Sequence, residues 1–194
     1  MKIIEKHFLE SSQLILSLQN YKKEINDIVE SIVKCDRKNN KILIAGNGGS
    51  CSDAEHFAGE LLCTFNKKSR KSISAIPLTN HSAALTAWSN DFEFESFFRR
   101  QVDAHGKEED ILFLLSTGGG NLSGSKASAN LVYAAEEGIK KKMKIISLVG
   151  KAGGELKKIS NICIHVKSKN TAYIQEAHMS ILHCVCEILD NLKN

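Results

Sequence analysis

The stretch that decides the fold reads Lys41-Ile42-Leu43-Ile44-Ala45-Gly46-Asn47-Gly48-Gly49-Ser50 and continues as Cys51-Ser52-Asp53-Ala54-Glu55-His56-Phe57-Ala58-Gly59-Glu60. An apolar run leads into a glycine-rich turn, and the turn leads into a helical pattern. Glycine lets the backbone turn sharply and approach a ligand closely, and the free N–H groups at a helix start attract anions. The stretch therefore predicts a buried strand, a phosphate-binding turn and a helix.

His56 and Glu60 lie four residues apart on this expected helix. Residues at that spacing share one helix face, so the two side chains can reach one metal ion or one substrate. A glycine-rich turn also occurs in parallel-sheet proteins that bind nothing there, and two polar residues are typical of a solvated helix face. Both features on one element favour a ligand site.

The composition is that of one soluble globular domain. The chain has 194 residues, 42% hydrophobic and 25% charged, and no apolar run approaches the ~20 residues of a membrane helix. The formal charge of +4 is spread along the chain, and the lysine cluster at 140–144 is typical of a solvated helix end. We predict no nucleic-acid or membrane partner.

The first residues lack the pattern of a signal peptide, and the six cysteines show neither zinc-finger spacing nor a disulfide framework. We therefore expect a cytoplasmic protein with reduced thiols.

Hydrophobic periodicity places the remaining elements. Apolar residues recur three or four apart over 4–36, which predicts one or two long amphipathic helices with a wide apolar face. We interpret residues 1–36 as a helical oligomerisation segment and 37–194 as the α/β core of a single domain. Further strands are expected at 72–78, 111–115, 144–149 and 162–166, and helices at 83–88, 92–102, 127–138 and 172–192, with a turn and short helix at 150–159. The alternation predicts a doubly wound five-stranded parallel sheet flanked by helices.

A second loop rich in glycine and hydroxyls, Ser116 to Ser125, follows the strand at 111–115. Ligands of such sheets bind beyond the carboxyl ends of the strands, and both glycine-rich loops leave such ends. Ser116, Thr117 and Ser123, together with free backbone N–H groups, could hold a phosphate monoester without an arginine.

The last expected helix carries Gln175 and His183. Histidines at a helix end are more often structural than catalytic. Yet His56, Glu60 and His183 form the set that an aldose–ketose isomerase needs. Glu60 could act as the base, His183 as the acid at the carbonyl oxygen, and a divalent metal as the electrophile that stabilises an enediolate.

An ordered set of motifs carries a family resemblance. The set comprises Gly46-Asn47-Gly48-Gly49-Ser50, Asp53-Ala54, His56-Phe57-Ala58 with Glu60-Leu61, Asn90-Asp91-Phe92, Ser116-Thr117, Gly150-Lys151 with Gly153-Gly154, and Ile174-Gln175-Glu176 with His178 and His183. In this order the motifs resemble bacterial phosphoheptose isomerases, members of the sugar-isomerase (SIS) domain group. The resemblance implies a flavodoxin-like sheet and a homotetramer with active sites between subunits. It also implies conversion of sedoheptulose 7-phosphate to D-glycero-D-manno-heptose 7-phosphate for lipopolysaccharide or capsule.

The resemblance also implies roles for individual residues. One Zn²⁺ per subunit would be bound by His56, Glu60, Gln175 and His183, and Glu60 and His183 would be the catalytic acid–base pair. The residues implied to bind substrate are Asn47, Gly48, Gly49, Ser50, Glu60, Asn90, Asp91, Ser116, Thr117, Gly118, Ser123 and Gln175.

The spacing of two implied ligands raises a geometric question. Gln175 and His183 are eight residues apart, which on an unbroken helix is roughly 12 Å of rise, whereas zinc ligands lie about 2.0–2.2 Å from the metal. Either the helix begins irregularly near Gln175 or the site combines residues of two chains. We predict that at least one ligand or substrate contact comes from a neighbouring subunit.

Several positions depart from the family pattern. Cys63-Thr64-Phe65 stands where the family has Gly-Arg-Tyr, and Tyr173-Ile174-Gln175-Glu176 stands where it has Arg-Ile-Gln-Glu. The second loop is also unusual, because residues 116–123 replace a compact Ser-Thr-Ser-Gly-Asn-Ser. Two alternatives therefore remain open: an isomerase of a different sugar phosphate, and a non-catalytic SIS protein that resembles the replication-initiation regulators.

Overall fold

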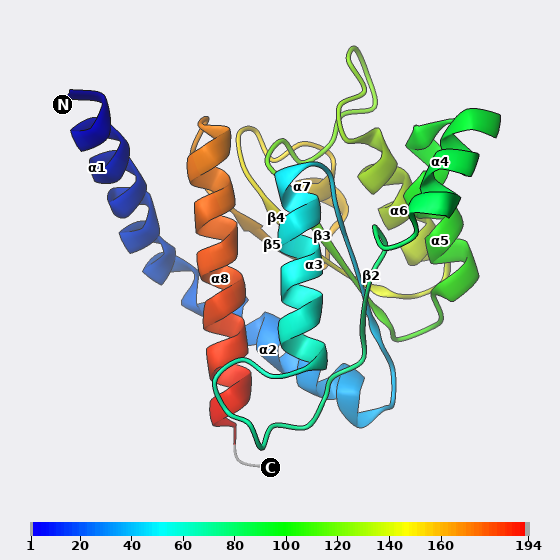
Figure 1. Ribbon diagram of the computed structural model, residues 1–194, viewed down its shortest axis with the longest axis horizontal. Coiled ribbons are helices and arrows are strands. Elements are labelled where there is room, and N and C mark those ends of the chain that lie inside the picture. Colours follow the sequence, from blue (N-terminus) through cyan, green and yellow to red (C-terminus); the bar gives the residue numbers. More distant parts are fainter. Residues whose placement is uncertain (1, 193–194) are drawn as a thin grey trace.

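Five short apolar segments form one parallel sheet in the computed structural model, which describes residues 2–192. The strand order is β2-β1-β3-β4-β5, and each neighbouring pair is parallel (Figure 1). The strands are β1 Ile42–Gly46, β2 Ala75–Pro77, β3 Ile111–Ser116, β4 Lys144–Val149 and β5 Ile162–His165. The predicted doubly wound five-stranded sheet is confirmed. Its second strand is shorter than expected, and Pro77 ends it at the sheet edge, where a missing N–H disturbs no inner ladder.

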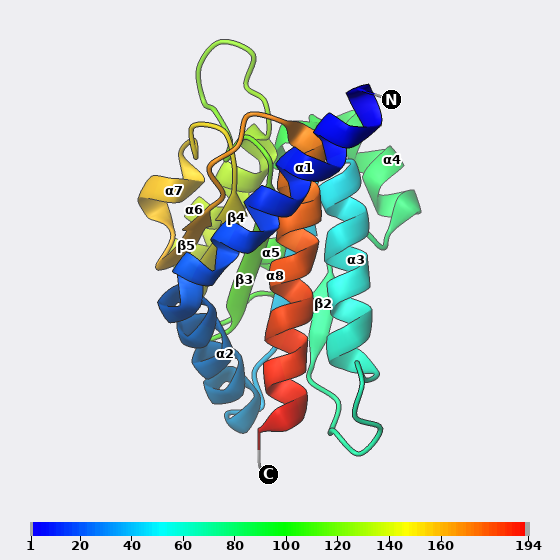
Figure 2. The same ribbon diagram turned by 90° about the vertical axis from the view of Figure 1, so that its left-hand side faces the viewer.

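Helices cover both faces of this sheet. The helices are α1 Lys2–Ser17, α2 Lys22–Arg37, α3 Gly49–Leu62, α4 Ser82–Asp91, α5 Phe97–His105, α6 Ala129–Lys140, α7 Leu156–Ile159 and α8 Thr171–Asn191, with 3-10 turns η1 Leu18–Tyr21 and η2 Phe94–Ser96. One hydrophobic core lies between the sheet and α2, α3 and α8, and a second lies between the sheet and α5, α6 and α7 (Figures 1 and 2).

The strand β1 shows why these segments are apolar throughout. Ile42 and Ile44 belong to the first core, whereas Leu43 and Ala45 belong to the second. Successive side chains of a strand point to opposite faces, so a strand covered on both faces must be apolar at every position. All five residues of β1 are buried, as are all six of β3.

The region around Asn90 differs from the sequence prediction. Ser89-Asn90-Asp91 was expected to separate two short helices, but α4 continues through Asp91. The N–H of Phe92 donates to the carbonyl of Trp88 (2.8 Å), and the two rings stack at 4.3 Å. Serine, asparagine and aspartate are weak helix formers, and this ring contact outweighs their local preference.

The N-terminal helical segment divides into two parts with different environments. Ile28 and Ile32 of α2 are fully buried and belong to the first core. In contrast, α1 has no buried residue, and its Ile3, Phe8 and Leu16 are 85%, 67% and 68% exposed. Figure 2 shows α1 crossing α8 on the outside of the molecule. The oligomerisation role of residues 1–36 stays a prediction, and α1 offers the free apolar surface that such a role requires.

Among residues 2–192, none of the helices combines the length and the hydropathy needed to span a lipid bilayer.

His178 of α8 is a fully buried polar residue in this apolar environment. Within the described residues neither ring nitrogen makes a hydrogen bond of normal geometry, although the Val149 carbonyl lies close enough to favour the charged ring. Burial outweighs that carbonyl and lowers the pKa of His178 to about 4. The folded protein therefore keeps this ring neutral.

This buried ring should make stability depend on pH. The pKa is 6.5 in the unfolded chain and about 4 in the folded one, so the unfolded chain takes up a proton first as the pH falls. The free energy of unfolding should then decrease by up to about 3 kcal/mol between about pH 6.5 and 4. Thermal denaturation across this pH range should show that the stability of His178→Leu depends less on pH than that of the wild type. The control His105→Leu, at an exposed position, should show the same pH dependence as the wild type. Equal slopes for the wild type and His178→Leu would contradict the assignment.

Candidate active site

Two glycine-rich loops meet at the carboxyl edge of the sheet. β1 ends at Gly46 and β3 at Ser116, and the two strands are adjacent, with Gly46 paired to Leu115. The chain passes from β1 outward to β2 and returns to β3 on the other side, so this edge is the topological switch point where ligands of such sheets bind.

The first loop depends on glycine at specific positions. Gly48 has φ +57°, in the left-handed region that favours glycine. A Cβ on Gly46 would lie 2.3 Å from the carbonyl oxygen of Ser50, which is buried, and a Cβ on Gly49 would lie 2.1 Å from Nε2 of Gln175. The predicted loop residues therefore form a tight turn, and the amide of Gln175 from α8 rests directly on it.

Asn47 is held in the loop by a residue that sequence analysis missed. Asn47 and Asn130 exchange two amide hydrogen bonds, each Nδ2 donating to the other Oδ1 at 2.9 Å. Asn130 is 3% exposed on the first turn of α6. In the sequence, Asn130 stands out only as a polar residue between the apolar residues Ala129 and Leu131. The paired amides fix the orientation of Asn47 at the mouth of the loop.

The second loop begins with equally restricted geometry. The N–H of Gly119 donates to Oγ of Ser116 (3.0 Å), so this hydroxyl keeps its own proton free for an acceptor. Gly119 and Gly120 have φ near +77° and +78°. A Cβ on Gly119 would lie 1.8 Å from the carbonyl oxygen of Gly153, so the loop packs against the loop that follows β4.

The remaining predicted contacts lie in exposed segments. Thr117 and Gly118 are half-buried at the start of the second loop. The second loop protrudes from the molecule (yellow-green in Figure 1). Ser123 of this loop is exposed, and its N–H and Oγ both donate to Oδ1 of Asn121. Asn90 is exposed at the end of α4, and its amide donates to Asp91 (2.8 Å). Within residues 2–192, no hydrogen bond joins Asn90 or Asp91 to the two glycine-rich loops.

Three metal-ligating side chains converge between α3 and α8. Nε2 of His56 lies 2.9 Å from Oε1 of Glu60, and Nε2 of His183 lies 3.4 Å from the same oxygen. The two ring nitrogens are 3.5 Å apart, and the three donor atoms lie within 4.8 Å of one another. α3 and α8 lie side by side in both ribbon views (Figures 1 and 2). The predicted approach of His183 to the His56–Glu60 pair is therefore present in the fold.

The electrostatics of this group fit a bound divalent cation. The Glu60 side chain is 13% exposed, and its Oε2 is buried with no hydrogen-bond partner among the described residues. Two imidazole nitrogens and one carboxylate oxygen are a ligand set that Zn²⁺ favours, with a position left for water or substrate. A cation among these atoms would compensate the buried carboxylate charge.

Gln175 lies apart from these three donors. Its amide rests on Gly49, whereas His56 and His183 follow about two helical turns further along α3 and α8. α8 is a regular helix from Thr171, capped by the side chain of Asn170, so an irregular helix start does not resolve the spacing. The role of Gln175 as a metal ligand stays a prediction and requires its amide to leave Gly49. The contribution of a neighbouring subunit also stays a prediction.

Asp53 is a second residue whose role the sequence did not reveal. It lies on α3 between Gly49 and His56, and its Oδ2 is buried without a partner among the described residues. Burial raises the pKa of Asp53 to about 6, although the nearby His56 favours the charged form. A carboxyl that titrates near neutral pH therefore lies beside the metal-ligating group.

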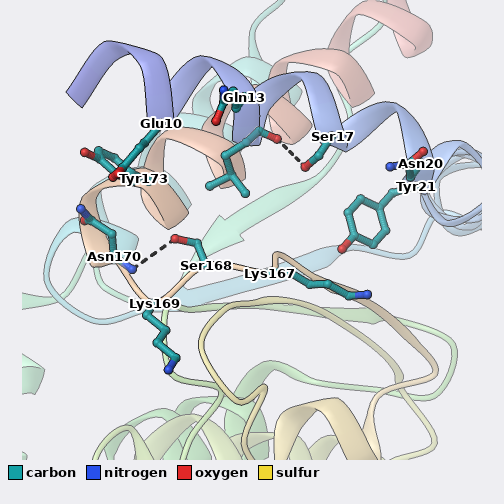
Figure 3. A pocket seen from close by; sticks show the side chains of 11 residues that line it. Glu10, Gln13, Ser17, Asn20, Tyr21, Lys167, Ser168, Lys169, Asn170 and Tyr173 are labelled. Carbon is teal, nitrogen blue, oxygen red and sulfur yellow. Dashed lines mark hydrogen bonds between the residues drawn. The ribbon is translucent and has the colours of Figure 1, made fainter. Parts of the chain in front are cut away.

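A separate cavity of about 710 Å³ lies between α1 and the connection from β5 to α8 (Figure 3). Its lining includes Tyr21, Lys167, Lys169 and Tyr173, and none of the predicted site residues belongs to it. Tyr173 packs edge-on against the ring of His7 in α1 (5.0 Å).

Comparison with known proteins defines the family. Residues 7–150 match the SIS domain family. The chain is 38% identical to phosphoheptose isomerase 1 of Campylobacter jejuni over 190 residues, covering 98% of both chains. A solved phosphoheptose isomerase from Francisella tularensis superimposes with a TM-score of 0.90 at 35% identity, and phosphoheptose isomerase GmhA from Neisseria gonorrhoeae with 0.88 at 31%, each covering 98% of both chains. The chain belongs to the phosphoheptose isomerase family of SIS domain proteins.

Binding of Zn²⁺ should stabilise the protein through the three converging donors. Addition of Zn²⁺ to chelator-treated protein at about 100 times its dissociation constant should raise the stability by about 2.7 kcal/mol, and the melting temperature by about 5 °C or more. Differential scanning calorimetry should show this increase for the wild type and not for His183→Gln. His81→Gln changes an exposed histidine outside the group and should retain it. An equal increase in His183→Gln would exclude this site.

The Asn47–Asn130 pair should be energetically coupled. Asn130→Leu should lower the stability by about 1 to 3 kcal/mol, because the amide of Asn47 loses its partner in a half-buried environment. Urea denaturation at one protein concentration should give the double variant Asn47→Leu/Asn130→Leu a smaller loss than the sum of the two single variants. Strictly additive losses would show that the two amides act independently.

Proposed function

We propose that this protein converts sedoheptulose 7-phosphate to D-glycero-D-manno-heptose 7-phosphate through an enediol. The observation that carries the proposal is the convergence of Glu60 and His183, 3.4 Å apart, between α3 and α8 in a chain that resembles phosphoheptose isomerases over its whole length. Proton transfer between adjacent carbons needs one base and one acid that face the same small volume.

The acid–base pair divides the proton transfers between carbon and oxygen. Glu60 removes a proton from C1 of the ketose while His183 protonates the carbonyl oxygen at C2, which gives the enediol. His183 then accepts the proton of the C1 hydroxyl, and Glu60 returns a proton to C2, which gives the aldose. Both residues end in their starting protonation states. No redox partner is needed.

We propose that His56, Glu60 and His183 hold a Zn²⁺ ion, with Gln175 as the expected fourth ligand. The ion would supply positive charge close to the oxygens on which negative charge develops. The buried, unpartnered Oε2 of Glu60 supports this assignment.

The phosphate is proposed to bind at the second loop. Ser116 retains a free hydroxyl proton because its oxygen already accepts from Gly119. Thr117 and Gly118 add a hydroxyl and an N–H at the carboxyl end of β3, where backbone donors attract anions. The first loop, with Asn47 oriented by Asn130, is proposed to position the sugar chain between this phosphate site and Glu60.

We further propose a cytoplasmic homotetramer with active sites between subunits, which supplies heptose for lipopolysaccharide or capsule. The exposed apolar face of α1 and the absence of any buried residue in α4 support an assembly that covers these helices. In such an assembly Asn90 and Asp91 would approach the site of a neighbouring subunit.

Turnover of sugar phosphates separates the proposed function from its alternatives. Purified protein with Zn²⁺ should isomerise sedoheptulose 7-phosphate faster than a panel of other ketose phosphates, and a chelator should abolish the activity. Preference for another ketose phosphate would favour the different isomerase. No turnover of any sugar, with tight binding to a protein partner, would favour the non-catalytic regulator.

Glu60→Gln should reduce kcat by about 10² to 10⁴, because the amide keeps the shape of the carboxylate but cannot accept the proton. The matched control is Glu55→Gln on the same helix, at an exposed position outside the group. It should retain wild-type kcat. Size-exclusion chromatography should show the same assembly for both variants. Near wild-type activity of Glu60→Gln would remove this residue from the role of base.

A further inference from the structure

A buried ion pair lies next to the proposed acid–base pair. The side chains of Arg70 and Asp190 are 7% and 2% exposed, and Nε of Arg70 donates to Oδ1 of Asp190 at 2.7 Å. Removing two charges from water is costly unless every remaining polar atom finds a partner. Oδ2 of Asp190 accepts from the N–H groups of Asn66 (2.6 Å) and Lys67 (2.7 Å). A fully satisfied pair of this kind specifies one local arrangement.

The guanidinium of Arg70 also holds the end of α3. It donates to the carbonyl of Leu61 at 3.0 Å and to the carbonyl of Glu60. These belong to the last carbonyls of the helix, which have no partner within it. The residue whose carboxylate faces His183 is therefore held through its own backbone by the Arg70–Asp190 pair.

The segment between α3 and β2, which contains Arg70, also places an aromatic ring against the proposed acid. The ring of Phe65 stacks on the ring of His183, with centroids 5.5 Å apart and planes inclined by 22°. His183 and Asp190 are seven residues apart and thus lie on the same face of α8. These contacts connect the two proposed catalytic residues. Glu60 faces His183, α8 carries both His183 and Asp190, and Arg70 binds Asp190 and the carbonyl of Glu60.

We propose that Arg70, Asp190 and Phe65 are positioning residues that fix the distance between Glu60 and His183 and the plane of the His183 ring. The inference rests on the proposed isomerase function and extends it. Neither glycine-rich loop is contacted by these three side chains in the described hydrogen bonds and ring contacts, so they act on proton transfer rather than on substrate binding. Misplacement of an acid or base by about 1 Å can reduce the rate about 100-fold.

The first test compares kcat with KM. Phe65→Leu keeps an apolar side chain but loses the planar face, and kcat should fall by about ten- to 100-fold while KM changes by less than about threefold. Phe65→Tyr keeps the ring and should restore wild-type kcat. Arg70→Lys loses the forked donor set and should lower kcat as Phe65→Leu does. Arg100→Lys, at a 61% exposed position, is the matched control and should behave as wild type.

The second test needs no activity. In metal-free protein with ¹³C-labelled histidine, the ring protons of His183 should carry an upfield shift from Phe65 that is lost in Phe65→Leu. The shift should also be reduced in Arg70→Lys, where Phe65 is still present.

An Arg70→Lys variant with unchanged kcat and an unchanged His183 shift would overturn the proposal, as would unchanged kcat in Phe65→Leu. If Arg70→Lys does not fold, the comparison of Phe65→Leu with Phe65→Tyr decides. If the wild type turns over no sugar phosphate, the proposed function fails, and the His183 shifts still decide whether the ion pair orders this ring.

Discussion

The close packing of α3 against α8 is the constraint on which the site depends. The two helices run in the same direction, with Gly49 against Gln175 near one end and Glu60 against His183 further along. At the first contact the Gln175 amide occupies the space that a Cβ on Gly49 would fill, 2.1 Å from Nε2. The second contact places two histidines around one carboxylate.

Hydrogen bonding is unevenly distributed around this contact. Arg70 and Asp190 are buried and fully partnered, and Asn47 and Asn130 satisfy each other. Glu60, by contrast, retains a buried oxygen without a partner within residues 2–192. Native proteins seldom leave buried polar atoms unpaired. The unpaired carboxylate atom among satisfied networks therefore marks the place where a ligand is expected, and the surrounding networks hold the helices that present it.

The two glycine-rich loops owe their position to the sheet and their shape to backbone contacts. Adjacent parallel strands bring Gly46 and Ser116 to the same edge. A Cβ on Gly119 would lie 1.8 Å from the carbonyl oxygen of Gly153, and the N–H of Leu156 donates to the carbonyl of Gly119 at 2.9 Å. The loops after β3 and β4 thus support each other. This contact anchors the start of an otherwise exposed second loop.

The features that depend on local spacing could be predicted from the amino-acid sequence. Continuous apolar runs identified the strands, the glycine run identified the first loop, and a separation of four residues placed His56 and Glu60 on one helix face. The sequence prediction misplaced the end of α4, because the preferences of Asn90 and Asp91 are weaker than the contact between Trp88 and Phe92.

The distant residues that join this helix face became known from the packing of the helices. His183 reaches Glu60 across 123 positions of the chain because α8 packs beside α3. Asn130 meets Asn47, and Arg70 meets Asp190, through contacts that have no periodic signal in the sequence. Local patterns record which face of an element is buried, but not which other element covers it. The partners of the glycine turn and the His56–Glu60 helix therefore became visible only in the packed fold.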